Sequence, residues 1–280
     1  MLQTNSQSTD QPVTTIMSTH EKARFQEVPV LPRIAVGAAR ALYVGPGLNL
    51  TPHLNVAVTM AIALQGAFEL RLWGREKKWS DWRALEVAHI PAQTLHHLRA
   101  TGPMVFLYLD PLADVLSTAS LAELNVGRAK LLELSQPFGL ESAFAAMGLQ
   151  AQASQDPRIA RVTREIDRQP DHFNHLREAA AMAGLSASRF RVRFSEEVGL
   201  PFRRYRLWRR MAVVMRELAA GNNLTAAAMA AGFASASHLS SSFKQMFGLA
   251  PSALATMGVE IDLSEDPAFS GRSLNPQVRR

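Results

Sequence analysis

The sequence predicts a two-domain α+β protein. We expect an N-terminal antiparallel β-barrel with trailing helices, followed by an all-α domain of two helix-turn-helix units joined by a long helix. Two observations support this. Short apolar runs between turn residues fill the first third of the chain, and two segments near the C-terminus look like copies of one another. Short strands at such spacing are typical of a barrel or sandwich, and a repeat marks a repeated structural unit.

The apolar runs justify the strands one by one. Stretches that are apolar or alternating predict strands at 34–44, 56–64, 68–73, 85–90 and 105–109. Leucine-rich helical periodicity follows over residues 113–153, broken at Pro137 and Gly139. We expect this helical stretch to pack on the barrel. A surface for a two-fold partner is the alternative.

The repeat covers residues 179–201 and 227–251. In each copy a short Ala-rich helix ends at a glycine suited to a left-handed conformation, Gly184 or Gly232. A serine, Ser186 or Ser235, then caps a second helix. Apolar residues at every fourth position predict one buried stripe on that second helix: Phe190, Phe194 and Val198, and in the other copy Leu239, Phe243 and Phe247. The plainer alternative is a pair of ordinary helical hairpins in a bundle core.

Two further helices frame the repeat. Asp156 is placed to cap a helix that begins at Pro157. Residues 202–220 predict one helix of roughly 28 Å between the two copies, and five arginines cluster in its first half. Thr225 is expected to cap the helix that follows. A rigid spacer of this size can set two groove-reading helices about 34 Å apart, one turn of B-DNA.

Composition and charge limit the class of protein. Between residues 151 and 257 there are 15 Lys and Arg against 8 Asp and Glu, so the net charge of +6 comes from the part that contains the repeat. Such an excess favours binding to nucleic acid. The chain has no cysteine and no long apolar run. A cytoplasmic protein without a membrane span is therefore expected.

The four expected parts are a disordered lead-in at 1–27, the barrel domain at 28–153, the repeat-containing domain at 154–257 and a flexible tail at 258–280.

The repeat also carries a family resemblance. Its first half reads Ala-x-x-x-Gly-Leu-Ser and continues with Phe190, Phe194, Gly199 and Tyr205. Its second half reads Ala-Gly-Phe-x-Ser and continues with Ser237-His238-Leu239, Phe243-Lys244, Phe247-Gly248 and Pro251. Residues 176–256 thereby resemble the DNA-binding domain of the AraC/XylS family of bacterial transcription regulators.

The resemblance implies a sequence-specific regulator that binds double-stranded promoter DNA. It also implies contact with RNA polymerase as an activator, a homodimer, and a response to a small-molecule effector through the N-terminal domain. Repression is the alternative to activation.

The family commonly places a cupin-like domain first, and the barrel region resembles the cupin barrel in part. Gly47 and His53 fit one metal-binding motif, in which Asn55 replaces the second histidine, and Pro91 and His96 fit the other. Two neutral imidazoles without a carboxylate make a poor metal site, so we expect no metal and no cofactor. His53, Asn55 and His96 are predicted instead to line an effector pocket.

Members of the family present the first, second, fifth and sixth residues after the capping serine to the DNA groove. The matching predicted base contacts are Ala187, Ser188, Arg191 and Val192 in the first unit, and Ala236, Ser237, Ser240 and Ser241 in the second. Arg191 is the strongest candidate, because a guanidinium can reach guanine O6 and N7 together. A solvated helix face is the alternative for Arg191. The short side chains of the second unit predict affinity with little base specificity.

Phosphate contacts are predicted from cations and from helix N-termini, which attract anions. The candidates are Arg189, Arg193, Arg203, Arg206, Arg210, Thr225, Ser235, His238 and Lys244. For His238, structural packing is the alternative.

Two other functions stay open. A cupin enzyme that depends on a metal and carries a nucleic-acid tether is one, although no catalytic constellation stands out and we expect no enzyme. A non-specific architectural DNA-binding protein is the other, favoured by the serine-rich second unit.

Overall fold

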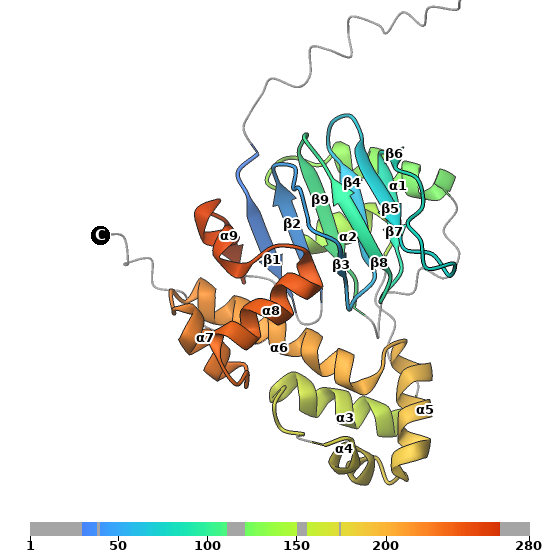
Figure 1. The fold of residues 1–280 in the computed structure, drawn as a ribbon, viewed down its shortest axis with the longest axis vertical. Helices are drawn as coiled ribbons and strands as arrows, with labels where there is room; N and C mark the ends of the chain where they lie inside the picture. The colour runs from blue at the N-terminus through green and yellow to red at the C-terminus, as the bar shows by residue number, and fades with distance from the viewer. Residues whose placement is uncertain (1–29, 38–39, 111–120, 150–155, 174, 264–280) are drawn as a thin grey trace, which may run out of the picture.

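The computed structural model describes all residues except 1–29, 38–39, 111–120, 150–155, 174 and 264–280. Two β-sheets form the upper part of the molecule in Figure 1, and helices α3 to α8 lie below and beside them. The predicted order of a β-rich part and an all-α part is therefore confirmed.

Ten strands make up the two sheets in the described residues. A six-stranded sheet has the order β10-β1-β2-β9-β4-β7, and a four-stranded sheet has the order β3-β8-β5-β6. The bounds are β1 Arg33–Val36, β2 Ala41–Gly45, β3 His53–Leu54, β4 Thr59–Ala63, β5 Phe68–Leu72, β6 Arg83–Leu85, β7 Val87–Ile90, β8 Leu95–Arg99, β9 Met104–Tyr108 and β10 Glu260–Asp262.

The two sheets pack face to face as a sandwich, whereas the sequence predicts a barrel. Their inner faces form one apolar core, to which β9 contributes Phe106 and β5 contributes Phe68. All pairings are antiparallel except β1 with β10, which is parallel. The predicted strand at 34–44 is two strands, β1 and β2, which pair antiparallel. β8 was not predicted, because adjacent His96 and His97 hide its alternation of buried and open positions.

Two helices cover the other face of the six-stranded sheet. They are α1 (Leu121–Leu132) and α2 (Leu140–Ala146). Leu124, Leu131 and Phe144 are buried there against Leu42 and Leu107 of the sheet. Packing of this helical stretch on the sheet is therefore confirmed, and its use as a surface for a partner stays a prediction.

The all-α part consists of two helix-turn-helix units and three further helices. The first unit is α4 (Leu176–Met182) with α5 (Ala187–Val198), and the second is α7 (Leu224–Ala230) with α8 (Ala236–Phe247). Between them runs α6 (Phe202–Ala219), with α3 (Pro157–Arg168) before and α9 (Pro251–Thr256) after the units. We call α5 and α8 the recognition helices.

The local signals at the helix ends are mostly confirmed. Ser186 accepts a hydrogen bond from the amide of Arg189, and Ser235 accepts one from that of His238. Asp156 caps α3. Thr225 does not cap α7, because Asn223 precedes the helix and its Oδ1 accepts from the Ala226 amide at 2.9 Å.

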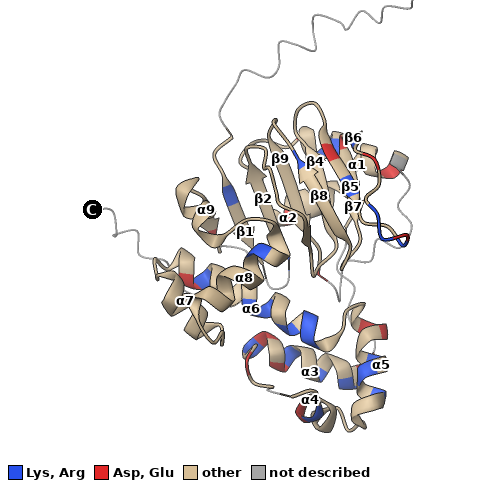
Figure 2. Ribbon diagram, viewed as in Figure 1, with Lys and Arg blue, Asp and Glu red and all other residues tan. Residues whose placement is uncertain are grey.

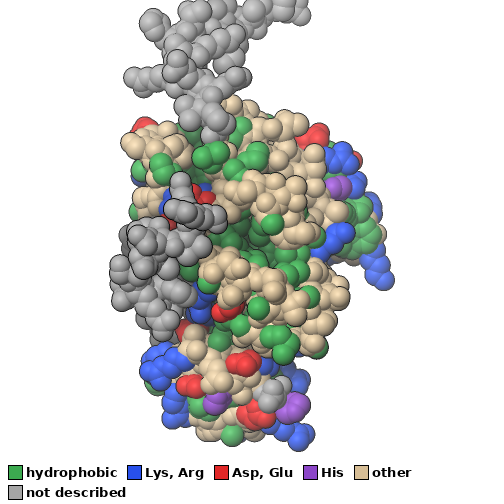
Figure 3. All heavy atoms as spheres, turned by 90° about the vertical axis from the view of Figure 1, so that its left-hand side faces the viewer, with side chains coloured by type: hydrophobic (Ala, Val, Ile, Leu, Met, Phe, Trp, Pro, Cys, Tyr) green, Lys and Arg blue, Asp and Glu red, His purple; other side chains and the backbone are tan. Residues whose placement is uncertain are grey.

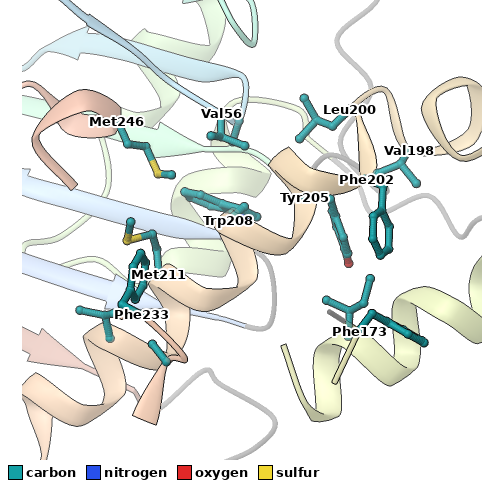
Figure 4. Close-up of a cluster of buried hydrophobic side chains, with 14 of the residues drawn as sticks. Val56, Phe173, Val198, Leu200, Phe202, Tyr205, Trp208, Met211, Phe233 and Met246 are labelled. Atoms are coloured by element: carbon teal, nitrogen blue, oxygen red, sulfur yellow. The ribbon is translucent and has the colours of Figure 1, made fainter. Parts of the chain in front are cut away.

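One core joins both helix-turn-helix units. Phe190, Phe194 and Val198 of α5 are fully buried, as the spacing predicts. Figure 4 shows α6 as the common element, with Phe202 and Tyr205 near Phe173 and with Trp208 near Val56 and Met246. Val56 comes from the β-rich part, so α6 also packs against the sheets.

The chain crosses back to the sheets after the second unit. Thr51 donates from its amide and its hydroxyl to the carbonyl oxygen of Gly248, at 3.0 and 2.8 Å, so the end of α8 lies against β3. Residues 260–262 then form β10 beside β1. The expectation of a flexible tail from 258 is thus wrong for residues 258–263, and residues 264–280 lie outside the described part of the chain, as does the predicted lead-in at 1–27.

Candidate nucleic-acid interface

The first recognition helix presents the predicted residues to the surface. Ser188, Arg191 and Val192 are exposed, and Ala187 is half-buried. They lie opposite the buried stripe of α5, because residues three and four apart share one face of a helix. Val192 is 54% exposed, which is unusual for a β-branched apolar residue and leaves its methyl groups open to a ligand. The structure thus brings the four predicted base contacts of this unit together on one open face.

Arg193 is placed differently from the other arginines of α5. Its guanidinium lies 3.2 Å from Asp156, 3.2 Å from Glu196 and 3.4 Å from Glu197. Three carboxylates around one cation compete with a DNA phosphate for it. The predicted phosphate contact is therefore held in an ion-pair network, while the exposed Arg189 lies near the helix start without that competition.

Asp156 is the centre of this network. It caps α3, accepts from Arg158 at 2.8 Å and from Arg193 at 3.2 Å, and is almost fully buried. The Arg158 hydrogen bonds hold the pKa of its carboxyl well below the usual range, and Arg193 adds to this effect. Asp156 thus ties α3 to the recognition helix α5.

This network predicts an acid-sensitive fold. A carboxyl with a lowered folded-state pKa stabilises the protein above its unfolded pKa, and that stability is lost as pH falls towards the folded pKa. We expect Asp156→Asn to be less stable than the parent near neutral pH and to lose less stability between about pH 5 and pH 2. Urea unfolding across this range measures the difference. Arg193→Ala should show a smaller change of the same kind. Parallel stability curves for parent and Asp156→Asn would contradict the assignment.

The second recognition helix presents small polar residues. Ser237 and Ser241 are exposed, and Ala236 and Ser240 are half-buried. Lys244 and the capping Ser235 are also exposed. The open face of α8 therefore offers hydroxyl groups, a helix N-terminus and one lysine.

Two predicted phosphate contacts of the second unit have other surroundings. His238 is exposed, and its ring lies 5.3 Å from that of Phe233, edge to face. It can therefore both pack and reach solvent. Thr225 is exposed on the first turn of α7.

The arginines of α6 fall into two groups. Arg203 is exposed at the start of the helix. Arg206 donates to the carbonyl oxygen of Pro170 at 3.4 Å, and Arg210 donates to that of Ala231 at 2.6 Å. Burial lowers the pKa of both of these guanidinium groups.

Arg210 also lies over the ring of Phe233, 4.0 Å from its centre. Arg209 is buried against Asp167 at 2.8 Å. These contacts brace α3 and the second unit against α6. Among the three predicted phosphate contacts on α6, Arg203 is the one with an exposed side chain.

Positive charge gathers on one side of the helical part. Figure 2 shows Lys and Arg on α3, α5 and the first half of α6, with Asp and Glu among them on α3 and α5, whereas α7 carries no Lys or Arg. A shallow depression on this side is lined by Arg158, Ser188, Arg189, Val192 and residues next to them. Arg158 lies on α3, outside the repeat, and was not predicted as a site residue because it belongs to no helix-turn-helix motif.

The predicted effector residues lie inside the sandwich. His53 and His96 pair across β3 and β8 with ring centres 4.1 Å apart, and both are buried. Burial lowers the pKa of His53 to about 3, with the neighbouring His96 adding to the shift, and burial also lowers the pKa of His96. Both rings are therefore neutral near pH 7. Each Nδ1 lies 2.8 Å from a backbone carbonyl oxygen, of Thr51 or Thr94.

Asn55 donates to the hydroxyl of Thr59 at 2.8 Å, and its Oδ1 is buried with no hydrogen-bond partner among the described residues. In the described part of the chain no group of three His, Cys, Asp or Glu is arranged to hold a metal ion.

A separate apolar cavity lies between the sheets and the helices. We call it the slit. It has a volume of about 80 Å³. Tyr108 of β9 lies where the slit meets the helices. The centre of its ring is 6.0 Å from that of Trp208 and 5.5 Å from that of Phe247. Other lining residues are Ile34, Arg40, Tyr43, Phe106, Met211, Phe243 and Leu254. Figure 3 shows hydrophobic side chains gathered across the middle of the face between the two parts.

The predicted effector residues do not line the slit. His53, Asn55 and His96 pack elsewhere in the sandwich. Residues of α6, α8 and α9 line it instead, and they lie 100 or more positions after the strand residues in the sequence. No local pattern could reveal such a cavity, because it exists only where the two parts meet.

Comparisons with known proteins agree with this architecture. Residues 179–257 match the family model described as a helix-turn-helix domain. A search of the solved structures finds apo ToxT K231A from Vibrio cholerae, which is 13% identical, with a TM-score of 0.51 over 78% of this chain and 97% of ToxT. It also finds wild-type ToxT bound to an unsaturated fatty acid, which is 13% identical, with a TM-score of 0.50 over 79% of this chain and 97% of ToxT.

These likenesses show a shared two-domain fold. A comparison with curated protein sequences gives no match. In the described residues no helix has the length and apolar character to cross a bilayer.

Proposed function

We propose that this chain, whose residues 179–257 are an AraC-type helix-turn-helix domain, is a sequence-specific DNA-binding transcription regulator. The observation that carries the proposal is the open face of α5. Ser188, Arg191 and Val192 are exposed there beside a concentration of arginines, while the opposite face is buried in the common core. A helix held in this way can enter a major groove and read base edges.

The two units support unequal roles. Arg191 can hydrogen-bond to guanine and Val192 can contact a thymine methyl group, so the first unit supplies the base readout. Ser237 and Ser241 favour contacts to phosphate, so the second unit supplies affinity and register. The 18 residues of α6 make a rigid connection of roughly 27 Å between them. We therefore propose binding to two successive major grooves on one side of the duplex.

The slit is the proposed effector site. Its walls are apolar, and Arg40 is the cation among the residues that line it. Arg40 already lies 3.0 Å from the carboxylate of Glu141. A structurally similar protein, ToxT, has been crystallised with an unsaturated fatty acid. We propose that the effector is an apolar carboxylic acid whose carboxylate takes the place of Glu141 at Arg40.

The size of the slit explains how such a ligand could regulate DNA binding. Sites for drug-sized ligands measure about 300–1,000 Å³, so a cavity of about 80 Å³ has to widen. Widening moves Trp208 of α6 and Phe247 of α8 away from the sheet. The ligand then favours the arrangement in which these helices are displaced, which is the differential binding that regulation needs. Activation through RNA polymerase and a homodimer remain predictions from the family resemblance.

Selection from a random duplex library tests the proposed DNA binding. We expect the purified protein to enrich one motif, with strong preference in one half and weak preference in the other, at centres about 10 bp apart. The enriched duplex should bind at least about 1,000-fold more tightly than unrelated DNA at physiological salt.

The serine-rich face of α8 favours one other candidate function, that of a non-specific architectural DNA-binding protein. It predicts that no motif is enriched and that all duplexes bind with a similar, steep dependence on salt. That result would contradict sequence-specific regulation.

A further inference from the structure

The strand β10 joins the end of the chain's helical part to the first strand of the N-terminal sheet. It runs parallel to β1, with Ile34 beside Ile261 and Ala35 beside Asp262. The amide of Glu260 donates to the carbonyl oxygen of Pro32 at 2.9 Å. The segment 259–263 thus adds an edge strand to a sheet whose other members come from residues 33–108.

An ion pair fastens this strand at its far end. Arg33 on β1 pairs with Asp262, and both side chains are about four-fifths buried. Arg33 also donates to the carbonyl oxygen of Phe138 at 3.1 Å, so its position is set from the sheet side.

Apolar residues beside the ion pair complete the attachment. Leu263 is buried, and Val259 and Ile261 are partly buried, against the core that contains α6. Directly before this segment, Leu254 of α9 lines the slit, and Ile34 of β1 lines it from the other side. The strand therefore connects the two walls of the slit.

We propose that β10 is a strap that keeps the slit closed and that effector entry requires its release. The inference rests on the proposed effector site. A ligand that enters only the open form has an apparent dissociation constant equal to the intrinsic one divided by the open fraction. The strap lowers that fraction, because α6 and α8 cannot leave the sheet while residues 259–263 remain paired with β1. Loosening the strap raises both the rate and the apparent affinity of ligand binding.

Charge reversal tests the strap. The probe is cis-9-hexadecenoic acid, with binding followed by calorimetry and by hydrogen exchange of the amides in β1 and α6. Asp262→Arg places a cation beside Arg33. We expect it to bind the probe about two- to fivefold more tightly, the range that corresponds to the loss of one partly exposed ion pair. In the double variant Arg33→Asp with Asp262→Arg, the affinity for the probe should return towards that of the parent, although the hydrogen bond from Arg33 to Phe138 is lost.

Two truncations provide the matched control. Removal of residues 259–280 deletes the strap and should tighten probe binding at least as much as Asp262→Arg. Removal of residues 264–280 leaves β10 in place and should bind the probe as the full chain does. If deletion of 259–280 leaves affinity and exchange unchanged, β10 does not close the slit. If no variant binds the probe, the strap guards no fatty-acid site and the inference fails. The selected duplex, bound by the same proteins, tests the DNA-binding proposal separately.

Discussion

Arg191→Ala is expected to lose the base preference of the first recognition helix. The exposed guanidinium is the side chain on α5 best suited to two hydrogen bonds with one guanine. Each such contact contributes about 1–3 kcal/mol of discrimination, which corresponds to roughly 5- to 150-fold. We expect affinity for the selected duplex to fall by that factor while affinity for unrelated DNA changes little. Gel shifts at one fixed salt concentration measure both.

Two controls separate base readout from charge. Arg83→Ala removes an exposed arginine from β6, far from the helical units, and should change neither affinity. Ser240→Ala changes the position in α8 that corresponds to Arg191, and should reduce specific binding by less than about tenfold, because a single hydroxyl contributes less than a bidentate pair. Wild-type affinity of Arg191→Ala for the selected duplex would show that another residue reads the bases.

Gly248→Ala is expected to destabilise the protein at the contact of α8 with the sheet. Gly248 ends α8 with φ of 75°, and an added Cβ would lie 2.6 Å from Nδ1 of His53 and 2.9 Å from the Thr51 carbonyl oxygen. The left-handed conformation costs about 1–2 kcal/mol for a residue with a Cβ. Overlap in a packed site adds about 1–3 kcal/mol. We therefore expect a loss of about 2–5 kcal/mol in the free energy of unfolding, unless α8 undocks from β3.

Gly184→Ala is the matched control. Gly184 has φ of 64°, and no atom lies within 4 Å of the Cβ that would be added. It should therefore show only the conformational cost of about 1–2 kcal/mol. Urea unfolding compares the two variants, and hydrogen exchange at Thr51 reports whether α8 has undocked. Equal losses for the two variants, with Thr51 still protected, would mean that the contact of α8 with β3 is loose.

The helical part was predictable almost element by element. Its caps and its buried stripes depend on neighbours within about four positions, and these are visible in the sequence at Ser186, Ser235, Phe190 and Phe194. The error at the start of α7 arose from two capping residues close together, of which Asn223 has the better position. Phe247 of the predicted stripe is only partly buried, and Met246 is buried instead. The short helix α9 was not predicted. In the β-rich part the apolar runs predicted most strands. They missed β3 and β8, where buried histidines replace the expected apolar residues.

The exposed base-contact residues of α5 were also predictable, because the buried stripe leaves one face for them. The surroundings of the predicted phosphate contacts were harder to predict. Arg193, Arg206 and Arg210 look like surface cations in the sequence, yet Asp156, Pro170 and Ala231 bind them in the fold. Each of these partners lies at least 21 positions away. Periodicity carries no information about such distant contacts.

The sequence alone was enough to define two helix-turn-helix units on one rigid connecting helix, since short-range spacing controls caps, stripes and turns. The tertiary structure decided how those units meet the sheets. The contact of Gly248 with Thr51 and the parallel pairing of β10 with β1 join residues nearly 200 or more positions apart. The slit has walls built from several segments of the chain. Their stability comes from apolar surface buried only when the chain is fully folded, and local sequence patterns do not record that burial.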